Sequence, residues 1–299
     1  MPHDRKLFSL DSLAMYMVTL LSEVPLILAR AIIVYLTAAF ILLAKGDPHP
    51  DPGIWAELGL LPPLWSVLAL ATPIGTGWWW KQRMGGREPS GRERLAYQDA
   101  VEHLQAHSPV PLPLPSSWFV TDEIEADAAV CGNTLLLSHG ILESEFLPAV
   151  LAHELGHLAS PDGRLTAAVN RLVLWTPRLK NPEGEPVETG LVFILQAAGW
   201  VIGKFLATIR GGGLGMYATG PLWGRYWRGR EYKADEYAAN LGQAEELADF
   251  LEIHALIHDH PVPFIWLTEH THPPAELRID RLRATAFEAE FGPSLPATA

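Results

Sequence analysis

The segment His153-Glu154-Leu155-Gly156-His157 constrains the fold more than any other part of this 299-residue chain. On an α-helix, positions i and i+4 lie on one face about one turn apart, so both imidazoles can bind the same small cation. Zn²⁺ accepts nitrogen ligands in that arrangement. The carboxylate of Glu154 can take a proton from a water whose pKa the metal lowers to about 7. The segment therefore predicts a metal-binding helix, which we expect to start near Pro148 and to stop within residues 160–163.

Two other histidine pairs have the same spacing, His103 with His107 and His254 with His258. Neither pair has a glutamate in the second position, so we interpret both as ordinary histidines on a helix surface or partly buried. For residues 153–157 the competing interpretation is a solvated polar stripe on an amphipathic helix. Apolar residues on both sides of the segment disfavour that interpretation.

A third metal ligand has to come from elsewhere, because a catalytic zinc site usually has three protein ligands and one open position. Residues 227–242 predict a helix that ends near Gly242. Glu231 and Asp235 lie four residues apart and share a face of that helix. We predict that Glu231 binds the metal and that Asp235 holds the second ring nitrogen of a ligand imidazole. Glu236 is the rival ligand. Alternatively, both carboxylates form solvated ion pairs with the basic residues of the same helix, Arg228, Arg230 and Lys233.

The composition limits the class of protein. The net charge of −12 argues against a nucleic-acid partner. Hydrophobic residues make up 48% of the chain, and its 11 tryptophans are typical of a protein at a membrane interface. Cys131 is the single cysteine, so no internal disulfide can form and a reducing compartment is suitable.

Two apolar segments near the N-terminus are long enough to cross a bilayer. Residues 24–44 are interrupted only by Arg30, and residues 54–80 end in three consecutive tryptophans that resemble an aromatic belt. We predict a transmembrane helical hairpin within residues 1–84, followed by a second domain over 85–299. The alternative is a hydrophobic hairpin buried in a soluble protein.

The charges around these segments predict their orientation. Residues 81–94 are strongly basic, whereas the loop between the two spans is acidic, with Asp47, Asp51 and Glu57 against Lys45. Under the positive-inside rule, both the N-terminus and the second domain face the cytoplasm. The sequence therefore predicts a multi-pass protein of the inner (plasma) membrane.

A third hydrophobic stretch lies within an insertion at about residues 165–226. If the segment after 226 shares a metal with His153, the chain must cross the membrane an even number of times between them. Residues 190–226 therefore either span the bilayer twice or lie on it. We favour a membrane-facing insertion, and the two-span alternative stays open.

The motifs occur in an order that resembles a known family. HELGH at 153–157, the later Glu231 and Asp235, and the segment Thr271-His272-Pro273-Pro274 with Glu276 and Arg278-Ile279 follow the order of HtpX-type membrane zinc metallopeptidases. These are gluzincins, a family that includes the CaaX prenyl proteases. Residues 127–164 are also similar to the strand, loop and active-site helix of that family.

This resemblance implies roles for individual residues. His153, His157 and Glu231 would bind one Zn²⁺ per chain, and Glu154 would be the general base. A backbone strand near Asp127 would pair with the substrate, through Ala128, Ala129, Val130, Cys131 and Gly132. The family usually has Asn-Ala-Phe-Ala-x-Gly where this chain has Asp-Ala-Ala-Val-Cys-Gly. His272 would be catalytic by steadying an oxyanion or gating the metal, or it is a turn histidine before Pro273.

Taken together, these features predict an α+β fold: a mostly helical, zincin-like metallopeptidase domain with a small sheet, joined to the N-terminal hairpin. The expected activity is zinc-dependent endopeptidase cleavage of membrane proteins or their cytoplasmic segments, in protein quality control. The expected partners are protein or peptide substrates and the lipid bilayer, and the oligomeric state is not specified. The alternative function is a catalytically silent, zinc-stabilised membrane adaptor or regulatory protein. A prenyl-peptide protease would need more membrane spans than two or four.

Overall fold

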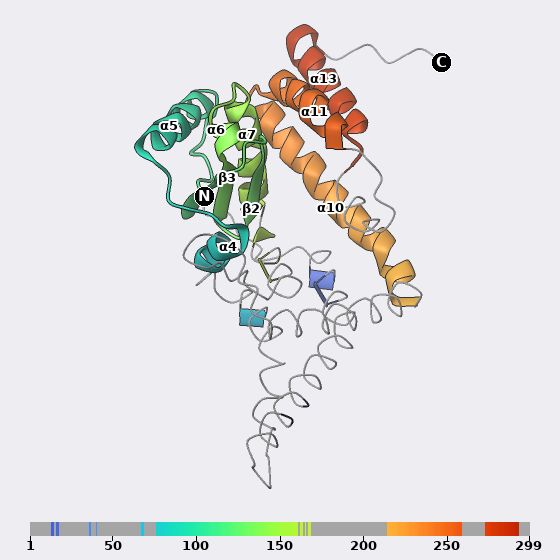
Figure 1. Ribbon diagram of the computed structural model, residues 1–299. Coiled ribbons are helices and arrows are strands. Elements are labelled where there is room, and N and C mark those ends of the chain that lie inside the picture. The colour runs from blue at the N-terminus through green and yellow to red at the C-terminus, as the bar shows by residue number, and fades with distance from the viewer. Residues whose placement is uncertain are drawn as a thin grey trace, which may run out of the picture. The chain divides into compact units, whose positions relative to one another are not determined.

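The computed structural model describes residues 76–160, 162–163, 165, 167–168, 214–258 and 273–292, with isolated residues at 13–14, 16–17, 36, 40 and 67–68. The chain divides into two compact units, one over 1–7, 75–163 and 223–299, and one over 8–74 and 164–222. The elements below belong to the first unit, except for the first turns of one helix, and Figure 1 labels them.

Several predictions concern residues outside this described part. They are nearly all of the span at 24–44, most of the span at 54–80, most of the insertion at 165–226, and His272. None of the helices in the described ranges combines the length and the apolar character needed to cross a bilayer. The division at residue 84 stays a prediction.

A three-stranded mixed sheet supports the domain. Its strands are β1 (Ser117–Thr121), β2 (Ala128–Cys131) and β3 (Thr134–Ser138). The order is β1-β3-β2, with β1 parallel and β2 antiparallel to β3. The central strand β3 is buried along its whole length. Gly132 and Asn133 join β2 to β3 in a two-residue turn, where Gly132 has φ 65°, a conformation that tight hairpins reserve for glycine. Within the described sheet, β2 is therefore an edge strand.

Helix α4 (Thr76–Met84) packs against this sheet. Gly77 makes the close approach possible, since a Cβ there would lie 2.8 Å from Ser117 Oγ and 3.0 Å from Thr134 Oγ1. Trp79 and Trp80 are buried, whereas Trp78 is 66% exposed. Two of the three tryptophans expected in an aromatic belt thus contribute to the packing of the domain.

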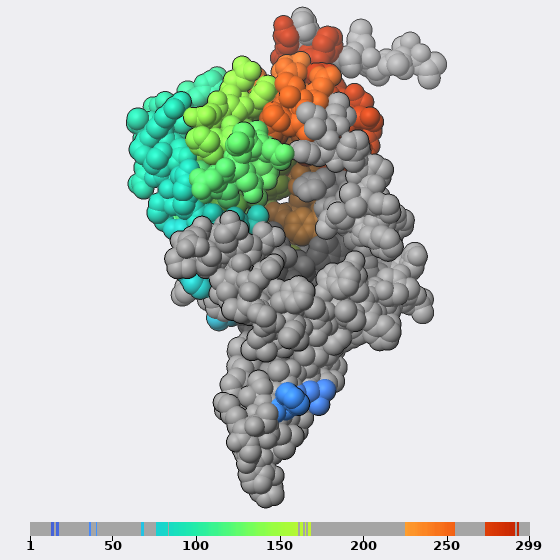
Figure 2. All heavy atoms as spheres, in the orientation of Figure 1, coloured from blue at the N-terminus to red at the C-terminus, as the bar shows by residue number. Residues whose placement is uncertain are grey.

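Three further helices flank the strands in sequence. Helix α5 (Gly91–Ala106) precedes β1, and α6 (His139–Leu142) and α7 (Leu147–Ala159) follow β3. Helix α7 has Pro148 in its first turn, where a missing N–H is tolerated, and ends at Ala159 with Ser160 as its C-cap. The predicted metal-binding helix is therefore confirmed at both ends. It packs against α5, β2 and a later helix, α11. Figure 2 shows α5 and the segments from β1 to α7 as one continuous surface.

The C-terminal part contains α10 (Leu214–Asn240), α11 (Ala244–His258) and α13 (Ala275–Phe291). Helix α10 starts before the predicted residue 227 and ends as expected, followed by Gly242 with φ 76°. Helices α11 and α13 lie side by side (Figure 1). Both add apolar side chains to the core that α7 shares with the sheet, including Leu247, Leu251, Ile279 and Leu282. The domain is thus mostly helical with a small mixed sheet, as predicted.

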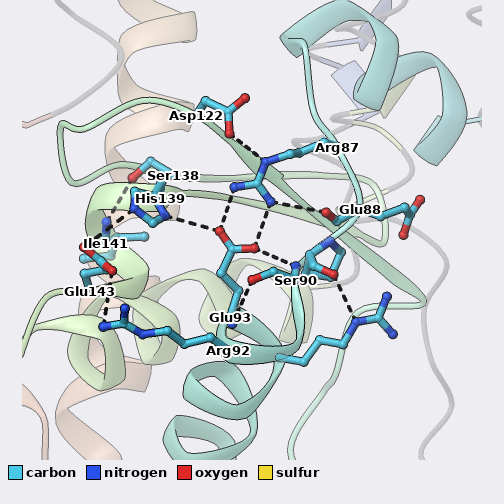
Figure 3. A network of polar contacts seen from close by, with 12 residues as sticks. Arg87, Glu88, Ser90, Arg92, Glu93, Asp122, Ser138, His139, Ile141 and Glu143 are labelled. Atoms are coloured by element: carbon cyan, nitrogen blue, oxygen red, sulfur yellow. Dashed lines mark hydrogen bonds and ion pairs between the residues drawn. The ribbon is translucent and has the colours of Figure 1, made fainter.

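A polar network fixes the start of α5 to the sheet and to α6 (Figure 3). Arg87 donates two hydrogen bonds to Glu93, of 2.8 and 2.7 Å, and one of 2.6 Å to Asp122. Glu93 also completes a capping box with Ser90, and its Oε1 lies 3.2 Å from Nδ1 of His139. The hydrogen bonds from Arg87 outweigh the effect of burial and hold the pKa of Glu93 far below its usual range.

Candidate metal centre

Helix α7 places His153, Glu154 and His157 together in the interior of the domain. His153 and Glu154 are buried, and His157 is partly buried. The two imidazole rings lie 4.8 Å apart and nearly perpendicular, at 84°. One side-chain ligand atom from each of the three residues falls within 4.8 Å of the others, a separation that a single metal ion can bridge. The predicted pairing of both histidines on one helix face is confirmed.

Helix α10 brings a second carboxylate to the same two rings. Glu231 is buried, and its Oε1 lies 3.3 Å from Nε2 of His157. Its Oε2 lies 3.5 Å from Nε2 of His153. Each carboxylate oxygen therefore faces one imidazole nitrogen. The rings direct their Nε2 atoms toward the same group, although Glu231 comes 74 residues after His157 in the sequence.

Gly156 allows the two helices to approach closely enough for this contact. A Cβ at position 156 would lie 2.8 Å from Cα of Ala234 and 3.0 Å from Cβ of Tyr237. The first distance would force the α10 backbone to shift. The glycine inside the HELGH segment thus sets the distance between the histidines of α7 and Glu231.

Asp235, one turn after Glu231, contacts the other nitrogen of His153. Its Oδ1 lies 2.9 Å from Nδ1 of that ring. This distance fits an Nδ1–H that donates to the carboxylate, so Nε2 is the ring nitrogen on the side of Glu231. Arg278 of α13 donates to both oxygens of Asp235, at 2.6 and 2.9 Å, and its Nη1 lies 3.3 Å from Glu231 Oε2. The hydrogen bonds from His153 and Arg278 outweigh burial and lower the pKa of Asp235.

The surroundings shift the pKa values of His153 and His157 in opposite directions. Burial lowers the pKa of His153, but hydrogen bonds to Asp235 and Glu231 outweigh it and raise the pKa to about 9. Burial lowers the pKa of His157 to about 4, opposed in part by the hydrogen bond to Glu231. A cation that binds both Nε2 atoms has to replace the proton on His153, whereas His157 is already neutral.

Glu154 differs from the other carboxylates of the site. Burial raises its pKa to about 7, with the charge of Glu231 contributing in the same direction. Its Oε2 is buried and has no hydrogen-bond partner within the described ranges. A carboxylate with a pKa near neutrality can both accept and release a proton, as a general base requires.

The side chains fit a divalent metal ion. Two imidazole nitrogens and a carboxylate are a ligand set typical of zinc in hydrolases. Two carboxylates, Glu154 and Glu231, lie near the rings. The oxygens of Glu231 each face one Nε2, whereas Glu154 keeps an orphaned buried oxygen, so the geometry favours Glu231 as the third ligand.

Most of the predicted site residues come together in one place. His153, Glu154, His157, Glu231 and Asp235 form a single buried cluster. The rival ligand Glu236 is exposed, and the solvated pairs proposed as an alternative do not fit carboxylates that are buried. The predicted substrate-binding strand forms β2, which packs against α7. The negative charge of Asp127, just before β2, also contributes to the raised pKa of Glu154.

Sequence reasoning missed the role of Arg278. The residue appears in the motif at 271–279, but nothing in the sequence indicates which carboxylates it contacts. Its hydrogen bonds join residues 43 positions apart. The available signal was a lone arginine within the buried face of an amphipathic helix, where an unpaired cation would be costly.

Comparisons with known proteins agree with this geometry. The family model described as Peptidase family M48 matches residues 125–286. The chain is 26% identical over 186 residues to the Protease HtpX of Alcanivorax borkumensis, covering 55% of this chain and 57% of that protein. It is 26% identical over 277 residues to the Protease HtpX homolog of Bifidobacterium longum, covering 79% of this chain and 86% of the relative.

The alignment with the first relative thus spans little more than half of that protein's length. Among solved structures, the crystal structure of Ste24p from S. mikatae is similar, with 15% sequence identity and a TM-score of 0.43. That similarity covers 92% of this chain and 66% of the other.

Proposed function

Since the chain belongs to peptidase family M48, we propose that it is a zinc-dependent endopeptidase with His153, His157 and Glu231 as metal ligands. The observation that carries this proposal is the convergence of both Nε2 atoms on the Glu231 carboxylate, at 3.5 and 3.3 Å. A solvated ion pair on α10 does not explain why a buried and a partly buried imidazole of α7 both face the buried Glu231 carboxylate. A shared cation accounts for all three orientations.

Bound zinc would supply a Lewis acid that polarises the scissile carbonyl and lowers the pKa of a water molecule. Glu154 would take the proton from that water and pass it to the leaving amine. Its pKa of about 7 and its unsatisfied buried oxygen suit both transfers. Asp235 would hold His153 in the tautomer whose Nε2 lone pair is available to the metal.

We propose that the substrate is a peptide in an extended conformation that pairs with β2. As the edge strand of the described sheet, β2 offers backbone donors and acceptors on its outer side. It packs against α7, so a peptide added there would run near Glu154. Residues Ala128 to Gly132 would then supply the backbone contacts, with Asp127 at one end.

We further propose that the substrates are membrane proteins or their cytoplasmic segments, handled in quality control. Support comes from the apolar runs at 24–44 and 54–80 and from the basic segment 81–94. In this proposal, residues 1–84 form a membrane hairpin and residues 85–299 form the peptidase domain. An insertion at about 165–226 faces the membrane, and His272 has a catalytic role.

The decisive experiment compares Glu154→Gln with the wild type, both purified in detergent. The variant should keep its zinc and its fold, while cleavage of an unfolded protein such as casein falls at least about 10²–10⁴-fold. The control is Glu143→Gln, which alters an exposed glutamate after α6 and should leave cleavage unchanged. Equal cleavage by Glu154→Gln and the wild type would exclude Glu154 as the base. Zinc binding without any cleavage by the wild type would favour the adaptor.

A further inference from the structure

We propose that Arg278 is a positioning residue of the metal site: it holds Asp235 against His153 and so leaves Glu231 as the carboxylate that binds the metal. This inference rests on the proposed ligand set. It adds a residue of α13 to a site otherwise built from α7 and α10, and it explains how two like charges one helical turn apart take different roles.

The contacts of Arg278 are unequal between the two carboxylates. Its Nη2 donates to Asp235 Oδ1 at 2.6 Å, and its Nε donates to Asp235 Oδ2 at 2.9 Å. Its Nη1 lies 3.3 Å from Glu231 Oε2. A planar guanidinium that makes two parallel hydrogen bonds fixes the plane of a carboxylate. Asp235 is therefore fixed by two bonds, while Glu231 has one longer contact with Arg278.

The fixed plane of Asp235 determines the orientation of His153. Oδ1 of Asp235 accepts the hydrogen bond from Nη2 of Arg278 and also lies 2.9 Å from Nδ1 of His153. Nη2 itself lies 3.4 Å from that ring nitrogen. If Asp235 rotated, the ring would lose its partner and its Nε2 would turn away from Glu231. Arg278 thus acts on the metal ligand through one intermediate side chain.

The charges explain why a cation is needed at this position. Glu231 and Asp235 are both buried and lie on one face of α10, so they repel each other before any metal binds. Arg278 is buried with them. It offsets one of the two negative charges that α10 places there. A cation so close to the site also repels a metal ion, and the test therefore has to establish which effect is larger.

Arg281, three residues further along α13, is the matched control. Its guanidinium lies 4.1 Å from the centre of the Tyr232 ring on α10, so it also connects α13 to α10. Arg281 is exposed, and Tyr232 is not a ligand. If the role of Arg278 were only to attach α13 to α10, loss of either arginine would affect the metal site alike.

The experiment measures zinc affinity on the full chain in detergent, by competition with a chromophoric chelator after removal of the metal. Arg278→Met keeps the length of the side chain but removes the charge, and we expect affinity to fall about 10–100-fold. Arg278→Lys keeps the charge but cannot donate the two parallel hydrogen bonds, so the loss of zinc affinity should be smaller than in Arg278→Met. Arg281→Met should bind zinc as the wild type does. Cobalt-substituted Arg278→Met should show an altered visible spectrum, and cobalt-substituted Arg281→Met should not.

A second variant keeps the test decisive if Arg278→Met does not fold. Arg278→Met combined with Asp235→Asn removes both charges of the pair, and it should bind zinc no more weakly than Asp235→Asn alone. Wild-type affinity in a folded Arg278→Met, a gain in affinity, equal losses in Arg281→Met, or additive losses in the double variant would each overturn the proposal. If Glu231→Ala keeps its zinc, the proposed ligand set fails instead, independently of Arg278.

Discussion

An arginine, a carboxylate and a histidine come together in two places in the described domain. At the start of α5, Arg87 donates two hydrogen bonds to Glu93, whose Oε1 lies 3.2 Å from Nδ1 of His139. At the candidate metal centre, Arg278 donates two hydrogen bonds to Asp235, whose Oδ1 lies 2.9 Å from Nδ1 of His153. The same three chemical groups therefore form the same connections.

The two groups differ in what lies beyond the histidine. Nε2 of His139 is 3.6 Å from Glu143, and both of those side chains are more than 40% exposed. Nε2 of His153 faces buried Glu231, which a second imidazole also contacts. The proposed metal centre therefore differs from the α5 network in having a buried end that a second imidazole also contacts.

The largest effect should separate the two terminal carboxylates. Glu231→Ala removes the group that both Nε2 atoms face, and we expect zinc to be almost completely lost. The reduction in affinity should exceed the roughly 10–100-fold that outer hydrogen-bond partners cause. Glu143→Ala removes the corresponding carboxylate beside His139 and should leave zinc content unchanged. Metal analysis of both purified variants checks this, and full zinc content in Glu231→Ala would place the third ligand elsewhere.

The next effect concerns the close approach of α7 to α10. The α5 network does not depend on this approach. Gly156→Ala places a methyl group 2.8 Å from the α10 backbone at Ala234. We expect a destabilisation of about 1–3 kcal/mol from overpacking, with weaker zinc binding because Glu231 moves with α10. Gly91→Ala, where a Cβ meets no atom within 4 Å, is the matched control and should not lower the unfolding temperature. Wild-type zinc affinity in Gly156→Ala would show that α10 tolerates the methyl group.

A smaller effect should identify the α5 network as purely structural. Glu93→Gln should cost about 1 kcal/mol of stability, since one partner of the hydrogen bond, Arg87, is partly exposed and solvent screens the pair. Zinc affinity should not change. The variant tests the structural half of the comparison, and a loss of zinc would mean that the two networks are coupled.

The same variant has a defined pH dependence. The pKa of Glu93 is lowered in the folded state by the hydrogen bonds from Arg87, so its stabilising contribution is fully present above the ordinary glutamate value, near 4.5. It is lost as the pH falls below that value toward the folded-state pKa. The difference in thermal midpoint between wild type and Glu93→Gln should therefore be constant from pH 7 to pH 5 and shrink under more acidic conditions. A difference that grew with acidity would contradict the assignment.

How much of this could be predicted from sequence depends on the separation of the residues involved. The α7 histidines and the carboxylates of α10 were identified because helical spacing places each pair on one face. The ends of α7 and α10 followed from local proline and glycine signals. Arg278 was not identified, because its contacts depend on how α13 packs against α10, and that packing is set by the shared apolar core rather than by any local pattern.

The smallest expected effect concerns a histidine pair that matches the metal pair in spacing and ring distance. The rings of His103 and His107 lie 4.9 Å apart on α5, against 4.8 Å for His153 and His157. Both are exposed, and Nδ1 of His107 lies 2.9 Å from the carbonyl oxygen of His103. In the described part of the chain, the cluster of possible metal ligands lies at 153–157.

The double substitution of His103 and His107 by alanine should therefore leave zinc content and cleavage unchanged. The control is the single substitution His157→Ala, which removes one member of the metal pair and should release zinc. Loss of zinc from the α5 variant would mean that helical spacing alone creates a metal site. Retention of zinc would show that helical spacing alone does not make the α5 pair a metal site, in agreement with a role for the buried carboxylate that faces His153 and His157.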